Sequence, residues 1–135
     1  MYLLDTNILS ELIKKRPSPL VLSQMGSKPA HALYTSCICV MELRFGSLLR
    51  GDAEDFWEKV TQEIISKVTI VPITGREALS AGNILAELRK KGEGIGLEDV
   101  LIAASAIANK LVVVTANTRR FSRIKGLKVE NWLKA

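Results

Sequence analysis

Four polar residues, far apart in the chain, have side chains suited to binding a divalent cation: Asp5, Glu42, Asp99 and Asn117. Asp5 directly follows the apolar residues 2–4, and Asn117 ends a second run that begins with the apolar residues 111–114. Polar groups at the ends of parallel strands share one edge of the sheet, where open α/β folds bind ligands. Carboxylates that meet at one point repel each other unless a hard cation lies between them. The pattern therefore predicts a metal-dependent active site.

Each of the three acids also has an ordinary structural interpretation. Asp5 could cap the helix that follows it, Glu42 could be an exposed helix residue, and Asp99 could serve the first turn of its own helix. The functional interpretation depends on all three reaching the same edge of one sheet.

The elements that must position these acids alternate between strands and helices along the chain. We expect strands over residues 1–4, 32–35, 68–72, 111–115 and 128–130, and helices over residues 8–14, 20–25, 39–49, 53–66, 74–91 and 97–109. Thr74 and Glu77 have the spacing of a capping box, and the helix from Leu97 is apolar almost all round, which is typical of a buried helix. The alternation predicts a three-layer α/β/α fold with four or five mainly parallel strands.

Length and composition predict one globular domain spanning residues 1–135. Apolar residues make up 47% of the chain and charged residues 24%, which is the balance of a folded soluble protein. No apolar stretch approaches the roughly 18 residues that a membrane-spanning helix needs. The first apolar run stops at Asp5, which excludes a signal peptide, so we expect a cytoplasmic protein.

The two cysteines, Cys37 and Cys39, are separated by one residue, which suits neither an ordinary disulfide nor a paired zinc site. The only histidine, His31, leaves no second nitrogen ligand for zinc and no histidine pair for acid–base catalysis. We therefore predict two buried, reduced thiols.

Positive charge gathers toward the end of the chain. The net charge is +5, and residues 100–129 contain no acid but six basic residues: Lys110, Arg119, Arg120, Arg123, Lys125 and Lys128. A basic stretch beside a metal site suits a polyanionic substrate. On charge alone, a solvated basic surface is an equally good interpretation.

Four segments together resemble the PIN-domain ribonucleases, and within them the VapC toxins of bacterial toxin–antitoxin pairs. They are Leu3-Leu4-Asp5-Thr6-Asn7, Val40-Met41-Glu42-Leu43-Arg44-Phe45-Gly46, Asp99-Val100-Leu101-Ile102-Ala103-Ala104 and Val114-Thr115-Ala116-Asn117. The ending, residues 121–132, is also similar to VapC proteins. Each segment alone is weakly specific, but their order and spacing cover essentially the whole chain.

The resemblance implies roles for individual residues. Asp5, Glu42 and Asp99 match the catalytic acids that hold Mg²⁺ or Mn²⁺. Asn117 stands at a fourth position that is often Asp in the wider family, and it contributes an oxygen but no charge. Thr6 and Thr115 match polar positions that hydrogen-bond near the metal site.

The function implied by the resemblance is that of a metal-dependent endoribonuclease toxin of a type II toxin–antitoxin system. Such a toxin hydrolyses phosphodiester bonds in structured RNA, tRNA or rRNA, and so stops translation. The candidates for RNA backbone contact are Arg119, Arg120, Arg123 and Lys125.

The implied partners are a VapB-type antitoxin, a second copy of the chain in a homodimer, and operator DNA only through the antitoxin. An antitoxin inhibits by placing a basic residue among the acids. The candidate contact surfaces are the N-terminal helices and the region of Phe56 and Trp57.

Three alternatives remain open on the sequence. A receiver-like signalling domain also gathers acids around Mg²⁺, but the segment 111–117 supplies no lysine of the kind it needs. A nucleotide-binding module would use residues 92–96, which follow a helix rather than a strand. A catalytically weak PIN-like RNA-binding domain is consistent with Asn117 in place of an acid.

Overall fold

Five short strands form one sheet in the computed structural model, which describes residues 1–135. The strands are β1 (Tyr2–Leu4), β2 (Leu33–Ser36), β3 (Thr69–Val71), β4 (Val112–Val114) and β5 (Val129–Glu130). Their order is β3-β2-β1-β4-β5, and every neighbouring pair is parallel. β1 therefore lies at the centre, where the connections turn from one half of the sheet to the other.

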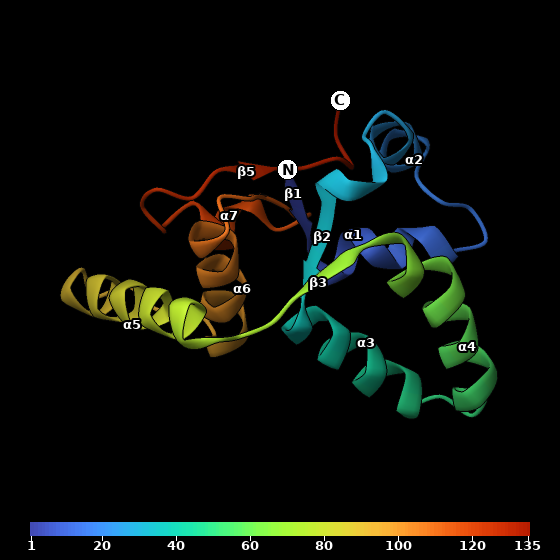
Figure 1. The fold of residues 1–135 in the computed structure, drawn as a ribbon, viewed down its shortest axis with the longest axis horizontal. Helices are drawn as coiled ribbons and strands as arrows, with labels where there is room; N and C mark the ends of the chain where they lie inside the picture. The colour runs from blue at the N-terminus through green and yellow to red at the C-terminus, as the bar shows by residue number, and fades with distance from the viewer.

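Helices cover both faces of this sheet. Those of two or more turns are α2 (Pro19–Gly26), α3 (Cys37–Leu48), α4 (Ala53–Glu63), α5 (Gly75–Lys90) and α6 (Leu97–Ala108), and the shorter ones are α1 (Thr6–Leu9), α7 (Thr118–Phe121) and the 3₁₀ turns η1 (Ser10–Ile13), η2 (Ala30–Ala32) and η3 (Ile65–Lys67). Figure 1 shows α5 and α6 on one side of the strands and α1, α3 and α4 on the other. None of the helices has both the length and the apolar character that crossing a bilayer requires.

The side chains of the central strands alternate between the two faces of the sheet, and each face has its own hydrophobic core. Leu3 and Val113 are fully buried in a cluster with residues of α5 and α6, whereas Leu4 and Val114 are fully buried in a second cluster with residues of α1, α3 and α4. Successive side chains of a strand point to opposite faces, so each strand contributes to both cores. The three-layer arrangement follows from this double burial, as predicted.

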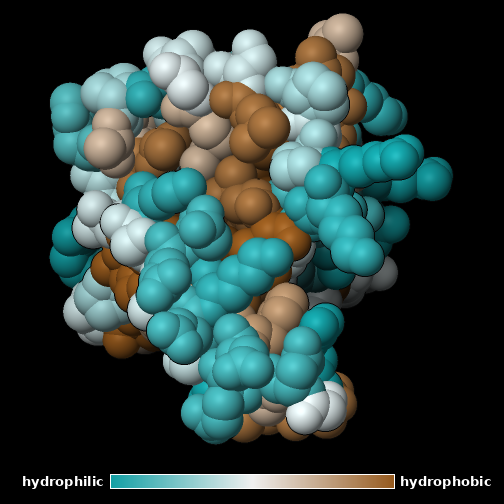
Figure 2. Space-filling model, turned by 90° about the vertical axis from the view of Figure 1, so that its right-hand side faces the viewer, coloured by the Kyte–Doolittle hydropathy of each residue, from teal (hydrophilic) through white to brown (hydrophobic).

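Unlike the central strands, which are buried on both faces, α4 is buried on one side only. Its first turn carries Glu54 and Asp55, and its inner side buries Val60 completely. Hydrophilic side chains dominate the side of the molecule to which α4 belongs, with hydrophobic ones visible between them (Figure 2). This helix therefore packs by one stripe and leaves the rest to solvent.

Most of the expected elements are confirmed, but three differ. The helix expected over residues 8–14 is instead α1 followed by η1, because it begins directly after Asp5, whose carboxylate caps it by accepting from the Thr6 N–H. The helix expected to reach residue 66 ends at Glu63, and η3 follows it. The short helix α7 was not predicted.

Cys37 and Cys39 are both free thiols, but only Cys39 is buried, so the prediction of two buried thiols is wrong for Cys37.

The predicted capping box of α5 is present and extends into a buried polar contact. Glu77, 2% exposed, accepts from the Thr74 N–H at 2.9 Å and from the Asn109 side chain at 3.0 Å. Asn109 follows the last residue of α6, so one carboxylate joins the start of α5 to the end of α6. The hydrogen bonds from Thr74 lower the pKa of Glu77 from 4.5 to about 2.

We expect this carboxylate to make stability depend on acid. A group whose folded pKa is lowered contributes stability that is complete above its unfolded pKa and is lost as the pH falls toward the folded value. Glu77→Gln should therefore lose the wild-type advantage that is present above pH 4.5 and vanishes toward pH 2. Urea unfolding from pH 6 to pH 2 measures this. The exposed Glu87→Gln is the control, and a Glu77→Gln deficit that does not change with pH would contradict the assignment.

Candidate active site

Asp5 stands at the point where the central strand ends. Its backbone N–H still donates to the Val114 carbonyl at 2.9 Å, so the sheet fixes its position. Its side chain is 4% exposed, and one oxygen accepts from the Thr6 N–H at 2.8 Å. Because β1 lies between β2 and β4, Asp5 occupies the switch point of the sheet, where folds of this class bind ligands.

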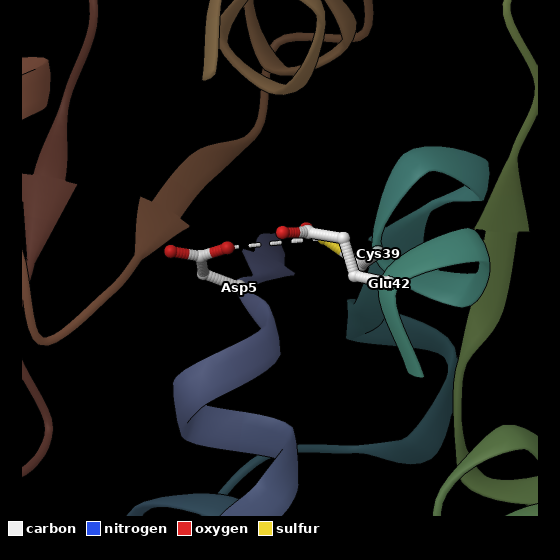
Figure 3. A group of neighbouring side chains, drawn as sticks. All are labelled: Asp5, Cys39 and Glu42. Carbon is white, nitrogen blue, oxygen red and sulfur yellow. Dashed lines mark hydrogen bonds between the residues drawn. The ribbon is translucent and has the colours of Figure 1, made fainter. Parts of the chain in front are cut away.

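Glu42 reaches the same place from α3. That helix begins directly after β2, where the Ser36 hydroxyl caps it by accepting from the Ile38 N–H at 3.1 Å. Glu42 then faces Asp5 across the end of the sheet (Figure 3). The Thr6 hydroxyl donates to Glu42 at 2.9 Å, which links the end of β1 to α3 through a side chain.

A thiol lies beside these two acids. Cys39 precedes Glu42 by one helical turn, so both side chains leave α3 on the same side. The ligand atoms of Asp5, Cys39 and Glu42 all lie within 4.8 Å of one another, and the Cys39 sulfur is 3.9 Å from an Asp5 oxygen (Figure 3). Burial raises the pKa of the Cys39 thiol to about 12, and the negative charge of Asp5 is the second cause of this rise. Sequence analysis predicted only a buried, reduced thiol at Cys39, with no part in the site.

Asp99 lies on the other wall of the same cleft. It occupies the first turn of α6 and is 9% exposed. Glu42 and Asp99 both line a cleft of about 570 Å³, with Met41, Phe45, Gly96, Glu98 and Arg120 as the other lining residues. Asp99 is outside the group of donors within 4.8 Å, and its carboxylate forms an ion pair with Arg120 at 3.0 Å.

Two acids of the site, Glu42 and Asp99, have raised pKa values. Burial raises the pKa of Glu42, and the charges of Asp5, Asp99 and Glu98 add to the rise while the hydrogen bond from Thr6 opposes it. Burial likewise raises the pKa of Asp99, which Arg120 opposes and Asp5 and Glu98 reinforce. Neither Asp5 nor Glu42 has a basic side chain in an ion pair. The site is thus negative and lacks a counter-charge except at Asp99.

Two further residues hold Asp5 in place. Thr115, fully buried after β4, donates its hydroxyl to Asp5 at 2.8 Å. Asn7 donates to the same carboxylate oxygen at 3.4 Å and accepts from the Ala116 N–H at 3.0 Å, so it connects the segments after β1 and β4. Sequence analysis assigned no role to Asn7, which was only the last residue of the first segment that resembles the family.

Asn117 is exposed and lines a different cleft from the one that Glu42 and Asp99 share. Its backbone N–H donates to the Thr115 hydroxyl at 3.0 Å, and no hydrogen bond joins its side-chain amide to the three acids. It lines an adjoining cleft of about 280 Å³, shared with Gly94, Ile95, Gly96, Arg119, Arg120 and Arg123. Lys125 is exposed but lines neither cleft. Three of the four basic candidates therefore gather beside the acids.

Comparison with known proteins decides the family. The model of the PIN domain matches residues 2–127. The chain is 37% identical over 135 residues to "Ribonuclease VapC2" of Haemophilus influenzae, with 98% of each chain covered. The chain belongs to the PIN-domain family, among the VapC ribonucleases. As a member of these toxins of toxin–antitoxin systems, it is a ribonuclease, and the receiver-like and nucleotide-binding alternatives are wrong.

A curated protein and a solved structure from Salmonella typhimurium extend the comparison. The chain is 31% identical to the "tRNA(fMet)-specific endonuclease VapC" of Salmonella typhimurium, with 97% of each covered. The crystal structure of DNA-bound VapBC from the same organism matches the fold with a TM-score of 0.89 at 33% identity, covering 97% of both chains. PIN-domain nucleases are typically metal-dependent, and the cluster of acids described here is of that kind.

Proposed function

We propose that this VapC-type chain cleaves a structured RNA of the tRNA class at a centre where Asp5, Glu42 and Asp99 hold Mg²⁺ or Mn²⁺. The observation that carries the proposal is the meeting of the Asp5 and Glu42 carboxylates within 4.8 Å without a positive partner. Asp99 supports it from the opposite wall of the cleft. The tRNA class rests on the printed specificity of the Salmonella relative.

The side chains at this site fit a hard divalent cation. Carboxylate oxygens are the ligands that Mg²⁺ and Mn²⁺ prefer. Burial and the nearby negative charge of Asp5 raise the pKa of both Glu42 and Asp99, and a bound cation would offset that charge. When bound, such an ion acidifies the attacking water and offsets negative charge on the phosphate. Asn117 adds no charge and lines the adjoining cleft, so we propose that it assists the reaction as a polar group beside the three acids and is not a ligand of the ion.

The neighbouring residues position the acids and the substrate. Thr6 and Thr115 each donate one hydrogen bond to an acid, which fixes the direction of its free oxygens. Arg119, Arg120 and Arg123 line the adjoining cleft, and we propose that they contact phosphates of the RNA near the cut. The RNA backbone would then cross from the basic cleft over the acidic one.

Metal removal tests the reaction. We expect the purified chain to cut tRNA in the presence of Mg²⁺ or Mn²⁺, to stop when the ion is chelated, and to resume when it is restored. Sequencing of new RNA ends should reveal one discrete site. If the protein leaves all RNA intact with either ion, the catalytically weak RNA-binding alternative is correct instead.

Arg120 and Arg123 should differ in what they control. Arg120→Ala removes the ion pair with Asp99. We expect cation binding to tighten by up to about fivefold, because an ion pair with one solvent-exposed partner is screened and contributes up to about 1 kcal/mol. Arg123→Ala should leave cation binding unchanged and reduce the slope of log RNA affinity against log salt by about 0.7–1. Calorimetry with Mn²⁺ and RNA binding at several salt concentrations separate the two. Arg16→Ala, at a distant arginine, is the control. The assignment would be contradicted if Arg120→Ala and Arg123→Ala had the same Mn²⁺ affinity and the same salt dependence of RNA affinity, or if Arg123→Ala had the same salt dependence as Arg16→Ala.

The partners follow from the solved relatives. VapBC of Salmonella typhimurium was crystallised bound to DNA. We propose that this chain also forms a homodimer, binds a VapB-type antitoxin that places a basic side chain among the acids, and reaches operator DNA only through it. Light scattering of the chain alone and of the co-expressed complex measures the mass of each assembly. A chain that stays monomeric and does not bind the antitoxin would contradict the proposal.

A further inference from the structure

We infer that the site also binds a thiophilic divalent cation, Zn²⁺ or a chemically similar ion, through Asp5, Cys39 and Glu42, and that this ion stops RNA cleavage. The inference rests on the proposed function, since it concerns regulation of the same centre. It assigns a role to a residue that the proposed reaction does not use.

The first observation is the composition of the nearest group of donors. The three side chains whose ligand atoms approach within 4.8 Å are two carboxylates and one thiol, whereas Asp99 is not among them. Two ligands of one tetrahedral zinc ion lie roughly 3.5 Å apart, so small side-chain rotations would close the group around an ion. Figure 3 shows the sulfur behind Glu42, directed toward Asp5.

The second observation is the setting of the thiol. Cys39 is fully buried, yet its sulfur faces a carboxylate at 3.9 Å instead of packing only against carbon atoms. A buried cysteine normally behaves as a small hydrophobic residue. Here the thiol and its acidic neighbours form a mixed sulfur and oxygen set, and no basic side chain pairs with either acid of the set.

The chemistry separates two classes of cation. Sulfur ligands favour Zn²⁺, Cd²⁺ and Co²⁺ over Mg²⁺, which keeps to oxygen ligands. On binding, the thiol proton passes to solvent and the sulfur takes the cation in its place. Cys39 is more deeply buried than Glu42, and Asp99 is already paired with Arg120. An ion held by the sulfur would therefore bind deeper than the open cleft and without Asp99. It would therefore occupy the Asp5 and Glu42 ligands without serving an RNA phosphate.

Cobalt absorption tests the sulfur contact directly. Titration of the purified chain with Co²⁺ alone should produce a sulfur-to-cobalt charge-transfer band in the near ultraviolet. Cys37→Ser is the matched control, because it removes the other, half-buried thiol and should keep the band. Cys39→Ser should lose it while circular dichroism reports an unchanged fold. Absence of the band in the wild type, or its loss only in Cys37→Ser, would overturn the inference, whether or not Cys39→Ser folds.

Inhibition assays connect the binding to regulation. At constant Mg²⁺, we expect Zn²⁺ to stop RNA cleavage by the wild type and by Cys37→Ser, and Cys39→Ser to need about tenfold more Zn²⁺ or a larger excess. Equal Zn²⁺ sensitivity of all three proteins would overturn the regulatory role. If cleavage with Mg²⁺ occurs but no cobalt band appears, only this inference fails. If the band appears but RNA is never cut, the proposed function fails and the inhibition with it.

Discussion

Asp5→Asn is expected to lower RNA cleavage by roughly 10⁴-fold, the scale found when the aspartate of a catalytic triad is replaced or removed. The replacement keeps the size of the side chain and can still accept the hydrogen bond from the Thr6 N–H. It removes a negative charge that contributes to the raised pKa of both Glu42 and Asp99. Repulsion among the acids falls, so the melting temperature should rise while activity is lost.

These opposite directions distinguish a functional acid from a structural one. Cleavage rates and thermal unfolding of the same preparation measure both, at fixed Mg²⁺ and again without it. Glu98→Gln is the matched control, because Glu98 also raises the pKa of Glu42 and Asp99 but is exposed and has no proposed contact with the cation. An Asp5→Asn protein that cuts RNA within tenfold of the wild-type rate would remove Asp5 from the reaction.

Phe121→Ala should produce the largest loss of stability of the substitutions considered. Phe121 ends α7, is fully buried, and belongs to the core cluster that contains Leu3 and Val113 of the central strands. Removing a buried aromatic ring costs about 3–5 kcal/mol, because the transfer free energy is lost and a cavity is left. The same change should weaken the Arg120–Asp99 contact, since Arg120 is the preceding residue of the same short helix.

Urea unfolding at neutral pH measures the loss. Phe45→Ala is the control, because it makes the same substitution on α3 at a side chain that is 65% exposed and should change stability by less than about 0.5 kcal/mol. A Phe121→Ala protein whose stability is within 1 kcal/mol of wild type would mean that α7 is not anchored as described.

The sequence predicted the architecture because its strongest patterns are local. Apolar strands followed by polar residues, as at Leu4 and Asp5, determine which ends meet once the strands are parallel, and the sheet is indeed all-parallel. The capping box of Thr74 and Glu77 marked the start of α5 for the same reason. Motifs spread over the whole chain predicted the family, which the PIN-domain match confirms.

Other features depend on contacts that no local pattern records. The helix α7 has four residues, too few to display a helical period, and packing of Phe121 decides its place. Arg120 was grouped with basic residues for RNA, whereas its pairing with Asp99 comes from the position of α7 relative to α6. Cys39 was compared only with the nearby cysteine and the distant histidine, yet the side chain it faces, Asp5, lies 34 positions away.

The central position of β1 has a consequence for how the protein is made. Asp5 is synthesised early, but the Thr115 hydroxyl that orients it lies 110 residues further on, and β1 pairs with β4 only after β4 has left the ribosome. A sheet that depends on such distant pairings forms late and slowly. The group of side chains that orients Asp5 is therefore complete only when nearly all of this domain is available to fold.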